Sequence, residues 1–414
     1  MLEKLVDGLP RTFWLLWTGL MVNRMGAFVI PFLAIYLGVG RDFSPAQTGV
    51  AIGLHGLSGA AGTMLSGVLA DRWGRRPTLL VGQFTAVVPI VGLGLAYDYW
   101  TIVGFAVLAS FFTGAVWPAY SAMMIDIVPE SDRLRSFSLN QWAVTLGSCI
   151  AGLGGTVAAQ DRHLLVFLVD ACATLGTALI TYFLLPETLP GKAAAPRTAA
   201  VLNRGLGAVF RDRTFIFLAF LNFVLLLVAS QNTTTLPIAM TADDNGPAVY
   251  GWMIVLNGVL LLGGQLFVPK MIAGRPDAHV LALAAALAGV GFGLNAFADG
   301  AWFYALTVVI WTLGEMVHFP ATSTTVASLA PVLMRGRYQA VLSLFISAAW
   351  AVGPITGGFV QGGLGTAVLW LGCGGLCALV VVGQLAAGPS RERRIEELRL
   401  AEAEAPEVPV ATGS

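Results

Sequence analysis

Two charged residues lie in the middle of long apolar segments of the sequence. Arg24 interrupts the stretch of residues 12–38, and Glu315 interrupts the stretch of residues 302–329. A charge at the centre of a bilayer costs about 2.5–3.5 kcal/mol on insertion scales, so each side chain should face a cavity or a partner. His318 follows Glu315 by one helical turn, and imidazole titrates near neutral pH. We therefore predict either a proton-carrying Glu315–His318 pair, or a static Arg24–Glu315 ion pair with His318 as a hydrogen-bonding residue between helices.

Aromatic and polar residues on the apolar segments are further candidates for binding. Trp311 shares a helical face with Glu315. Trp117, beside Pro118, could stack on a flat ligand or pack at a kink. For His55 and Asp170 we predict a structural pairing rather than contact with a ligand. Four amides could hydrogen-bond a ligand or instead join membrane helices to one another: Asn222, Gln231, Asn232 and Asn257.

A short charged segment, Gly67-Val-Leu-Ala-Asp-Arg-Trp-Gly-Arg-Arg-Pro77, separates the apolar segments 47–70 and 77–97. Charges this dense are excluded from hydrocarbon, so the segment should be a tight, water-facing hairpin between two membrane helices. Its spacing, Gly-x-x-x-Asp-Arg-x-Gly-Arg-Arg, resembles the loop between helices 2 and 3 of the major facilitator superfamily of secondary transporters. The alternative is a plain connector in which Gly74 permits the turn and the arginines set the topology.

The resemblance implies a role for the hairpin. In the family this loop is a latch between two halves of the protein, and it stabilises the outward-facing state. Gly67 would let another helix approach closely. Asp71 would lie opposite a helix N-terminus or pair with an arginine. Arg75 would reach an acid on span 4, for which Asp126 is the candidate. The gating residues implied by the resemblance are Gly67, Asp71, Arg72, Gly74, Arg75, Arg76 and Asp126.

The composition supports a membrane protein. Of the 414 residues, 57% are hydrophobic and 11% are charged, and the mean hydropathy is +0.78. Soluble domains carry roughly 25% charged residues. The formal net charge of zero argues against a nucleic-acid partner. The four cysteines lack metal-ligand spacing, and no nucleophile–base constellation is apparent, so we predict neither a metal site nor an enzyme.

Twelve apolar segments are long enough to span a bilayer, which takes about 20 residues. With the N-terminus in the cytoplasm, all but Arg24, Arg41 and Arg162 of the 23 Lys and Arg residues fall in cytoplasmic segments. The positive-inside rule therefore favours twelve spans with both termini cytoplasmic. The predicted spans are 12–38, 47–70, 77–97, 101–125, 136–159, 163–185, 214–239, 250–272, 278–297, 302–329, 338–361 and 366–387.

The two halves of the chain repeat each other at an offset of 202 residues. Arg11-Thr12-Phe13 recurs as Arg213-Thr214-Phe215, and Pro118-Ala119 recurs as Pro320-Ala321. A parallel duplication of a six-helix unit is the repeat plan of this superfamily. It implies an all-α membrane fold of twelve helices in two pseudo-symmetric halves, with spans 1, 4, 7 and 10 lining one central cavity. The predicted divisions are a first bundle (1–185), a cytoplasmic linker (186–212), a second bundle (213–387) and a cytoplasmic tail (388–414).

The sequence departs from the family pattern at two places. Proton-driven members often carry an arginine on span 4, where this chain has Ser110. Antiporters typically carry a Gly-Pro motif on span 5, which is incomplete here. A closer version lies on span 11 and favours close helix packing. The residues of that motif are Gly353, Pro354, Gly357 and Gly358.

The nearest resemblance is to the drug:proton antiporter branch. It implies a secondary transporter of the cell membrane that exports small amphipathic organic molecules in exchange for protons by alternating access. The expected partners are a small-molecule substrate, protons and the lipid bilayer. The protein is expected to be a monomer, to need no cofactor and to draw its energy from a proton gradient. The alternative is an importer or exporter of one specific metabolite, working by symport or uniport.

The latch hypothesis predicts that Asp71→Asn is expressed normally but loses most of its transport activity, because the carboxylate charge is removed and the side-chain size is kept. Substrate flux into proteoliposomes, normalised to the amount of reconstituted protein, measures the effect. Wild-type flux through this variant would contradict a latch role for Asp71.

Overall fold

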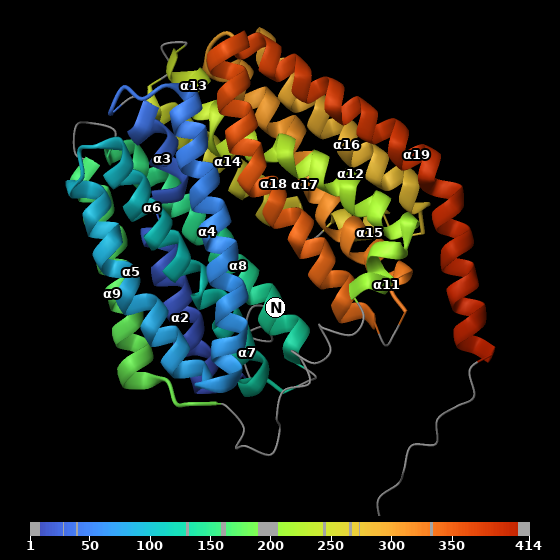
Figure 1. Ribbon diagram of the computed structural model, residues 1–414, viewed down its shortest axis with the longest axis horizontal. Helices are drawn as coiled ribbons and strands as arrows, with labels where there is room; N and C mark the ends of the chain where they lie inside the picture. Colours follow the sequence, from blue (N-terminus) through green and yellow to red (C-terminus); the bar gives the residue numbers. More distant parts are fainter. Residues whose placement is uncertain are drawn as a thin grey trace, which may run out of the picture.

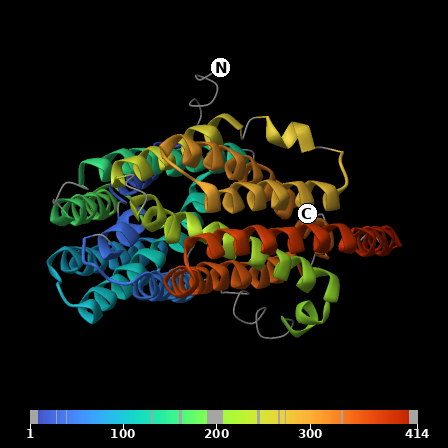
Figure 2. The ribbon, with the colours of Figure 1, turned by 90° about the horizontal axis from the view of Figure 1, so that it is seen from above.

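The computed structural model describes residues 9–27, 29–38, 40–129, 132–158, 163–188, 206–242, 246–264, 267–272, 274–331 and 334–404. All regular secondary structure in these ranges is helical, and the helices form two bundles that follow one another along the chain (Figures 1 and 2). Nine helices within the described ranges are long and apolar enough to cross a membrane, and the shorter apolar helix Ala248–Gly264 adds to them.

The first bundle contains the first six predicted spans. Its helices are α2 (Arg11–Gly26), α3 (Val29–Gly38), α4 (Pro45–Arg72), α5 (Arg75–Leu95), α6 (Tyr99–Gly114), α7 (Val116–Ile127), α8 (Arg133–Ala158) and α9 (His163–Leu184). The second bundle contains the last six spans. Its helices are α11 (Leu206–Arg211), α12 (Arg213–Ala229), η2 (Ser230–Thr233), α13 (Thr235–Ala242), α14 (Pro247–Gly264), α15 (Val268–Ile272), α16 (Asp277–Leu294), η3 (Asn295–Phe297), α17 (Ala301–Leu329), α18 (Arg335–Leu364) and α19 (Thr366–Glu404).

Proline explains why predicted spans 1, 4 and 7 are broken into two or more helices. Pro118 and Pro237 follow the ends of α6 and η2 by four residues, and Pro31 follows the end of α2 by five. A proline lacks the amide hydrogen that would bond the carbonyl four residues earlier, and its ring crowds that carbonyl. At the break in span 4, the freed carbonyl of Gly114 instead accepts a hydrogen bond from Thr63 Oγ1, at 3.0 Å. The breaks therefore follow directly from the sequence.

The last helix extends past the predicted boundary between the second bundle and the cytoplasmic tail. Helix α19 runs without interruption from Thr366 to Glu404, through the predicted boundary at residue 387. Gly388 packs against α16, where an added Cβ would lie 2.8 Å from Ala278. Arg391 is 2% exposed, and it donates hydrogen bonds to the side chain and the carbonyl of Gln384 at 2.5 and 2.9 Å. These contacts stabilise the helix across the boundary. Residues 189–205 of the predicted linker and 405–414 of the tail lie outside the described residues.

Among the described residues, the apolar clusters that contain side chains of both bundles lie at one end of the molecule. We call the end that holds the α4–α5 connection the hairpin end, and the opposite one the far end. At the far end, Phe32 and Ile35 of α3 belong to an apolar cluster of the second bundle, and Ile238 of α13 packs on the first bundle. At the hairpin end, the clusters around Phe13 and Phe215 are each drawn from a single bundle. The bundles accordingly meet near α3 and α13 and diverge toward α7 and α11 (Figure 1).

Glycines allow α4 and α18 to cross in backbone contact between the bundles. A Cβ on Gly49 would lie 2.3 Å from the Pro354 carbonyl oxygen, and one on Gly358 would lie 2.3 Å from that of Pro45. Gly353 and Gly357 face the second bundle's own η2, where an added Cβ would overlap the Ser230 hydroxyl or the Gln231 amide. The span 11 motif therefore serves close packing, as predicted, both between the bundles and within one.

The crossing predicts that Gly358→Val destabilises the protein, because the new side chain would overlap backbone atoms that have no room to move. The thermal midpoint in detergent should fall by about 4 °C or more. Gly363→Val, on the same helix but with no atom within 4 Å of the added Cβ, is the matched control and should change the midpoint little. Equal midpoints for the two variants would contradict the packing role of Gly358.

Candidate functional site

The charged residues within the apolar helices line two separate cavities. A cavity of about 330 Å³ inside the first bundle contains Arg24, and one of about 60 Å³ inside the second bundle contains Glu315. The expectation that both residues look into one central cavity is therefore wrong for this arrangement. The alternative of a static Arg24–Glu315 ion pair is also wrong, since the Glu315 carboxylate accepts a hydrogen bond from Asn257 and the two charges lie in different bundles.

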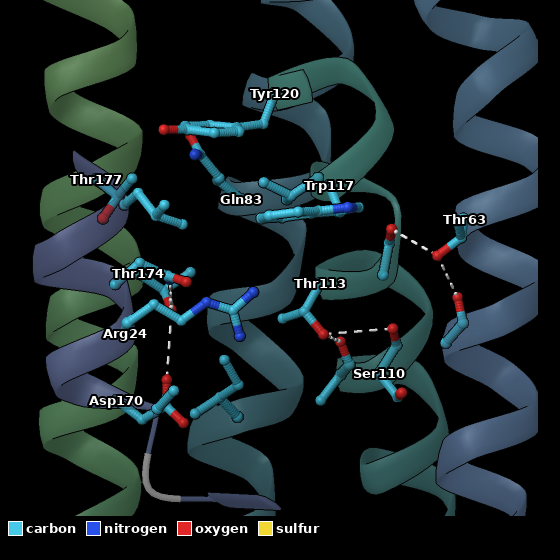
Figure 3. A pocket seen from close by; sticks show the side chains of 18 of the residues that line it. Arg24, Thr63, Gln83, Ser110, Thr113, Trp117, Tyr120, Asp170, Thr174 and Thr177 are labelled. Carbon is cyan, nitrogen blue, oxygen red and sulfur yellow. Dashed lines mark hydrogen bonds between the residues drawn. The ribbon is translucent and has the colours of Figure 1, made fainter. Parts of the chain in front are cut away.

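The larger cavity, the Arg24 cavity, is enclosed by α2, α4, α5, α6, α7 and α9. The guanidinium of Arg24 projects across it, beneath the ring of Trp117 (Figure 3). The Arg24 Cζ atom lies 5.8 Å from the Trp117 ring centre, and Trp117 stacks on Tyr120 with ring centres 5.9 Å apart. Trp117 lies just after the helix break, which agrees with packing at a kink, and it also lines the cavity; stacking on a ligand stays a prediction.

Asp170 faces Arg24 across the cavity from α9. Thr174 donates a hydrogen bond to Asp170 Oδ1 at 3.4 Å, and Asn23 donates to the Thr174 hydroxyl at 3.3 Å. His55 lines the same cavity as Asp170, and the pairing predicted for the two residues stays a prediction. The oxygen Oε1 of Gln83 is buried without a hydrogen-bond partner among the described residues.

The geometry around Ser110 explains why the family's span 4 arginine is absent. Ser110 is 4% exposed and donates a hydrogen bond to the carbonyl of His55 at 2.7 Å. A Cβ on Gly59 of α4 would lie 2.7 Å from the Ser110 hydroxyl. Helices α4 and α6 are therefore too close at this point for a long side chain, and the first bundle carries its interior cation on α2 instead, as Arg24.

The smaller cavity holds the predicted proton-carrying pair. Asn257 of α14 donates hydrogen bonds to Glu315 Oε2 at 3.1 Å and to the Thr312 hydroxyl at 3.0 Å. His318 is 6% exposed, lines the same cavity, and its Nδ1 lies 3.4 Å from the Thr322 hydroxyl. Trp311 also lines it and stacks on Phe292. The carboxyl and imidazole groups thus share one cavity, and each has its own polar partner.

The four amides have different surroundings. Gln231 joins helices: it is 1% exposed, donates to the Leu227 and Gly353 carbonyls and accepts from Thr234 and Thr235. Asn257 positions Glu315, as described above. Asn232 lines the smaller cavity with an Oδ1 that has no partner among the described residues. Asn222 is 3% exposed and lines neither cavity.

At the hairpin end, the structure brings Arg75 and Asp126 together, with Nε and Oδ2 3.4 Å apart. Gly74 adopts a φ of +119°, which permits the tight turn, as predicted. Gly67 differs from expectation, because an added Cβ would meet nothing within 4 Å. Its space stays open because the bundles diverge at this end. The side chain of Asp71 lies outside the part of the structure that is described, and Arg72 is exposed.

Glu187, which sequence reasoning missed, caps the start of α5. Its carboxylate accepts hydrogen bonds from the backbone amides of Arg75 and Arg76, at 2.9 and 3.2 Å. A carboxylate is favoured at this position by the positive end of the helix dipole. The signal was the acid directly after span 6, at the same membrane face as the hairpin. Arg76 also donates to the carbonyl of Tyr182, so the hairpin is fixed to the end of α9.

Comparison with known proteins agrees with this architecture. The sequence profile of the Major Facilitator Superfamily matches residues 16–332. The chain therefore belongs to the Major Facilitator Superfamily, whose members are membrane transporters rather than enzymes. It is a multi-pass membrane protein with the helical fold of that family.

Relatives and solved structures extend the comparison. The chain is 26% identical to the MFS-type transporter YttB of Bacillus subtilis (strain 168), over 84% of this chain and 88% of YttB. It is 26% identical to the multidrug resistance protein MdtH of Cronobacter sakazakii (82% and 84%), and 23% identical to a Na(+), Li(+), K(+)/H(+) antiporter of Planococcus maritimus (81% and 86%). The crystal structure of the nucleoside transporter NupG shares the fold, with a TM-score of 0.79, 15% identity and coverage of 91% and 99%.

The cap predicts that Glu187→Ala loosens the hairpin. Removal of both hydrogen bonds to the start of α5 should raise the rate of limited trypsin cleavage after Arg72 and Arg75 about threefold or more, because local opening becomes easier. Asp299→Ala removes an exposed carboxylate at the far end and is the matched control. Cleavage at the same rate in both variants would contradict the capping role.

Proposed function

We propose that the protein is a proton-coupled exporter of small amphipathic organic molecules, located in the cell membrane and working by alternating access. The observation that carries the proposal is Glu315, a carboxyl group held inside a membrane-spanning helix by Asn257 and lining a cavity with His318. An ionisable residue in such a place marks a proton or substrate path by default. Proton binding there would change the charge of the cavity between its two access states.

The arrangement of the bundles supports alternating access. At the far end, apolar clusters contain residues of both bundles, whereas at the hairpin end each cluster belongs to a single bundle. This is the geometry of a transporter open toward one side. The hairpin end carries Arg72, Arg75 and Arg76, so the positive-inside rule supports a cytoplasmic location for it and for both termini. The conformation then corresponds to the inward-open state.

In this scheme the hairpin acts as a latch in the outward-facing state, in which the bundles are closed at the hairpin end. The Arg75–Asp126 pair and the Glu187 cap order the hairpin within the first bundle. When the bundles close at this end, the hairpin would meet the start of α18, where a helix N-terminus favours a carboxylate such as that of Asp71.

The names of MdtH and of the Planococcus maritimus antiporter support drug export and proton exchange as properties of relatives.

The proposal predicts that Glu315→Gln abolishes proton-driven transport while substrate binding persists, because the amide keeps the hydrogen-bonding shape but cannot exchange a proton. The measurement uses proteoliposomes that contain the pH-sensitive dye pyranine and a panel of cationic, neutral and anionic amphipathic compounds. The wild-type protein should move protons when a transported compound is added, and Glu315→Gln should not. Asp299→Asn, an exposed carboxylate outside both cavities, is the control and should behave as wild type.

Two outcomes would overturn the proposal. Full proton movement by Glu315→Gln would remove this residue from the coupling role. If compound flux proceeds at the same rate with and without a pH gradient, transport is not coupled to protons. Uniport of a specific metabolite, the alternative that the sequence leaves open, would then be the better description.

A further inference from the structure

We propose that the Arg24 cavity binds the anionic group of a flat aromatic carboxylate. This inference deepens the proposed function by naming a substrate class for one cavity, and its biological meaning rests on that function. The volume of about 330 Å³ lies at the lower end of the range of small-molecule sites, roughly 300–1,000 Å³. A one- or two-ring organic acid fits such a volume.

The guanidinium of Arg24 is the recognition element. Its Nε atom is buried and has no hydrogen-bond partner among the described residues, although a buried donor left unpaired is unfavourable. Because a guanidinium presents a planar fork of donors, it matches a carboxylate with two parallel hydrogen bonds. Figure 3 shows the group extended across the cavity rather than folded against the wall. The guanidinium is therefore placed to bind a planar acceptor, such as a carboxylate, inside the cavity.

Trp117 supplies the second element, a flat apolar wall. Its side chain is 42% exposed although it lines the cavity, and one face is stacked on Tyr120 with an angle of 15° between the rings. The Arg24 Cζ atom is 5.8 Å from the Trp117 ring centre. An aromatic ring that stacks on the same wall would carry its carboxylate at about the level of the guanidinium, since offset stacking places ring centres 4.5–7 Å apart.

The charge balance of the cavity determines how strongly an anion binds. The titratable groups that face Arg24 are His55 from α4, Tyr120 from α7 and Asp170 from α9, and α5 and α6 contribute neutral side chains such as Gln83 and Thr113. When ionised, Asp170 attracts the guanidinium and repels an incoming carboxylate. Removing that negative charge should therefore strengthen anion binding, which a purely structural Arg24–Asp170 pair would not predict.

The test is equilibrium dialysis of the purified full-length protein in lipid nanodiscs against radiolabelled 2-naphthoate and, separately, its neutral analogue 2-naphthamide. Naphthoate should bind saturably, and naphthamide about tenfold more weakly, as expected for the loss of charge-assisted hydrogen bonds. Arg24→Gln should weaken naphthoate binding about tenfold, and Asp170→Asn should strengthen it about threefold. Arg11→Gln removes an exposed charge from the same helix and should leave binding unchanged.

The outcomes separate this inference from the proposed function, because binding is measured without a membrane gradient. Equal binding of naphthoate and naphthamide, or wild-type naphthoate binding by Arg24→Gln, would overturn the anion site whatever the transport assay shows. If Arg24→Gln does not elute as a folded protein, the anion site is tested by two other measurements. These are the comparison of naphthoate with naphthamide and the binding of naphthoate to Asp170→Asn. An unchanged or lower affinity of Asp170→Asn for naphthoate would then overturn the proposal.

Discussion

The backbone contact between α4 and α18 is the constraint on which the arrangement of the whole molecule depends. At Gly49 and Gly358 the two helices approach so closely that even a methyl group would overlap a carbonyl oxygen. Such an approach is available only where side chains are absent, and it fixes where the bundles touch. Because the helices diverge from that crossing, the two bundles part at the hairpin end, and Gly67 faces open space there. The close contact between the bundles therefore depends on a few glycines of α4 and α18.

The charged groups are arranged so that this crossing can act as a pivot. Arg75 pairs with Asp126 inside the first bundle, and Arg394 pairs with Asp212 inside the second, with Nε and Oδ2 3.7 Å apart. Tyr338 donates to the same Asp212 carboxylate at 2.8 Å, so the extended α19 is fixed to the start of α12 and α18. Each of these interactions joins elements of one bundle. Rocking of one bundle against the other would leave them intact, and the polar ends of each bundle would move as a unit.

The sequence predicts those features that depend on local chemistry. Apolar length predicts the spans, Pro118 favours the kink in span 4, and the resemblance of the hairpin motif predicts the contact of Arg75 with Asp126. What it could not predict depends on distances between helices. The amides Gln231 and Asn232 are adjacent in sequence, yet only the first finds partners on every side. The prediction that Arg24 and Glu315 line one cavity was wrong for the same reason, because the sequence does not show how far apart the two bundles lie. Asp170 was within reach of sequence reasoning, because Arg24 needs an acid and the first bundle offers one inside span 6.

On the proposed function, the two cavities would couple protons to cargo of opposite charge in opposite senses. In the first bundle a proton on Asp170 leaves the positive charge of Arg24 unbalanced, so proton and anion binding favour each other. In the second bundle a proton on Glu315 removes the negative charge of that cavity, so a proton and a cation compete. Thermodynamic linkage makes each effect reciprocal, so a bound anion would favour the proton in the first cavity and a bound cation would disfavour it in the second. Exchange of a proton for cargo, as proposed, would therefore depend on the Glu315 cavity, where proton and cation compete.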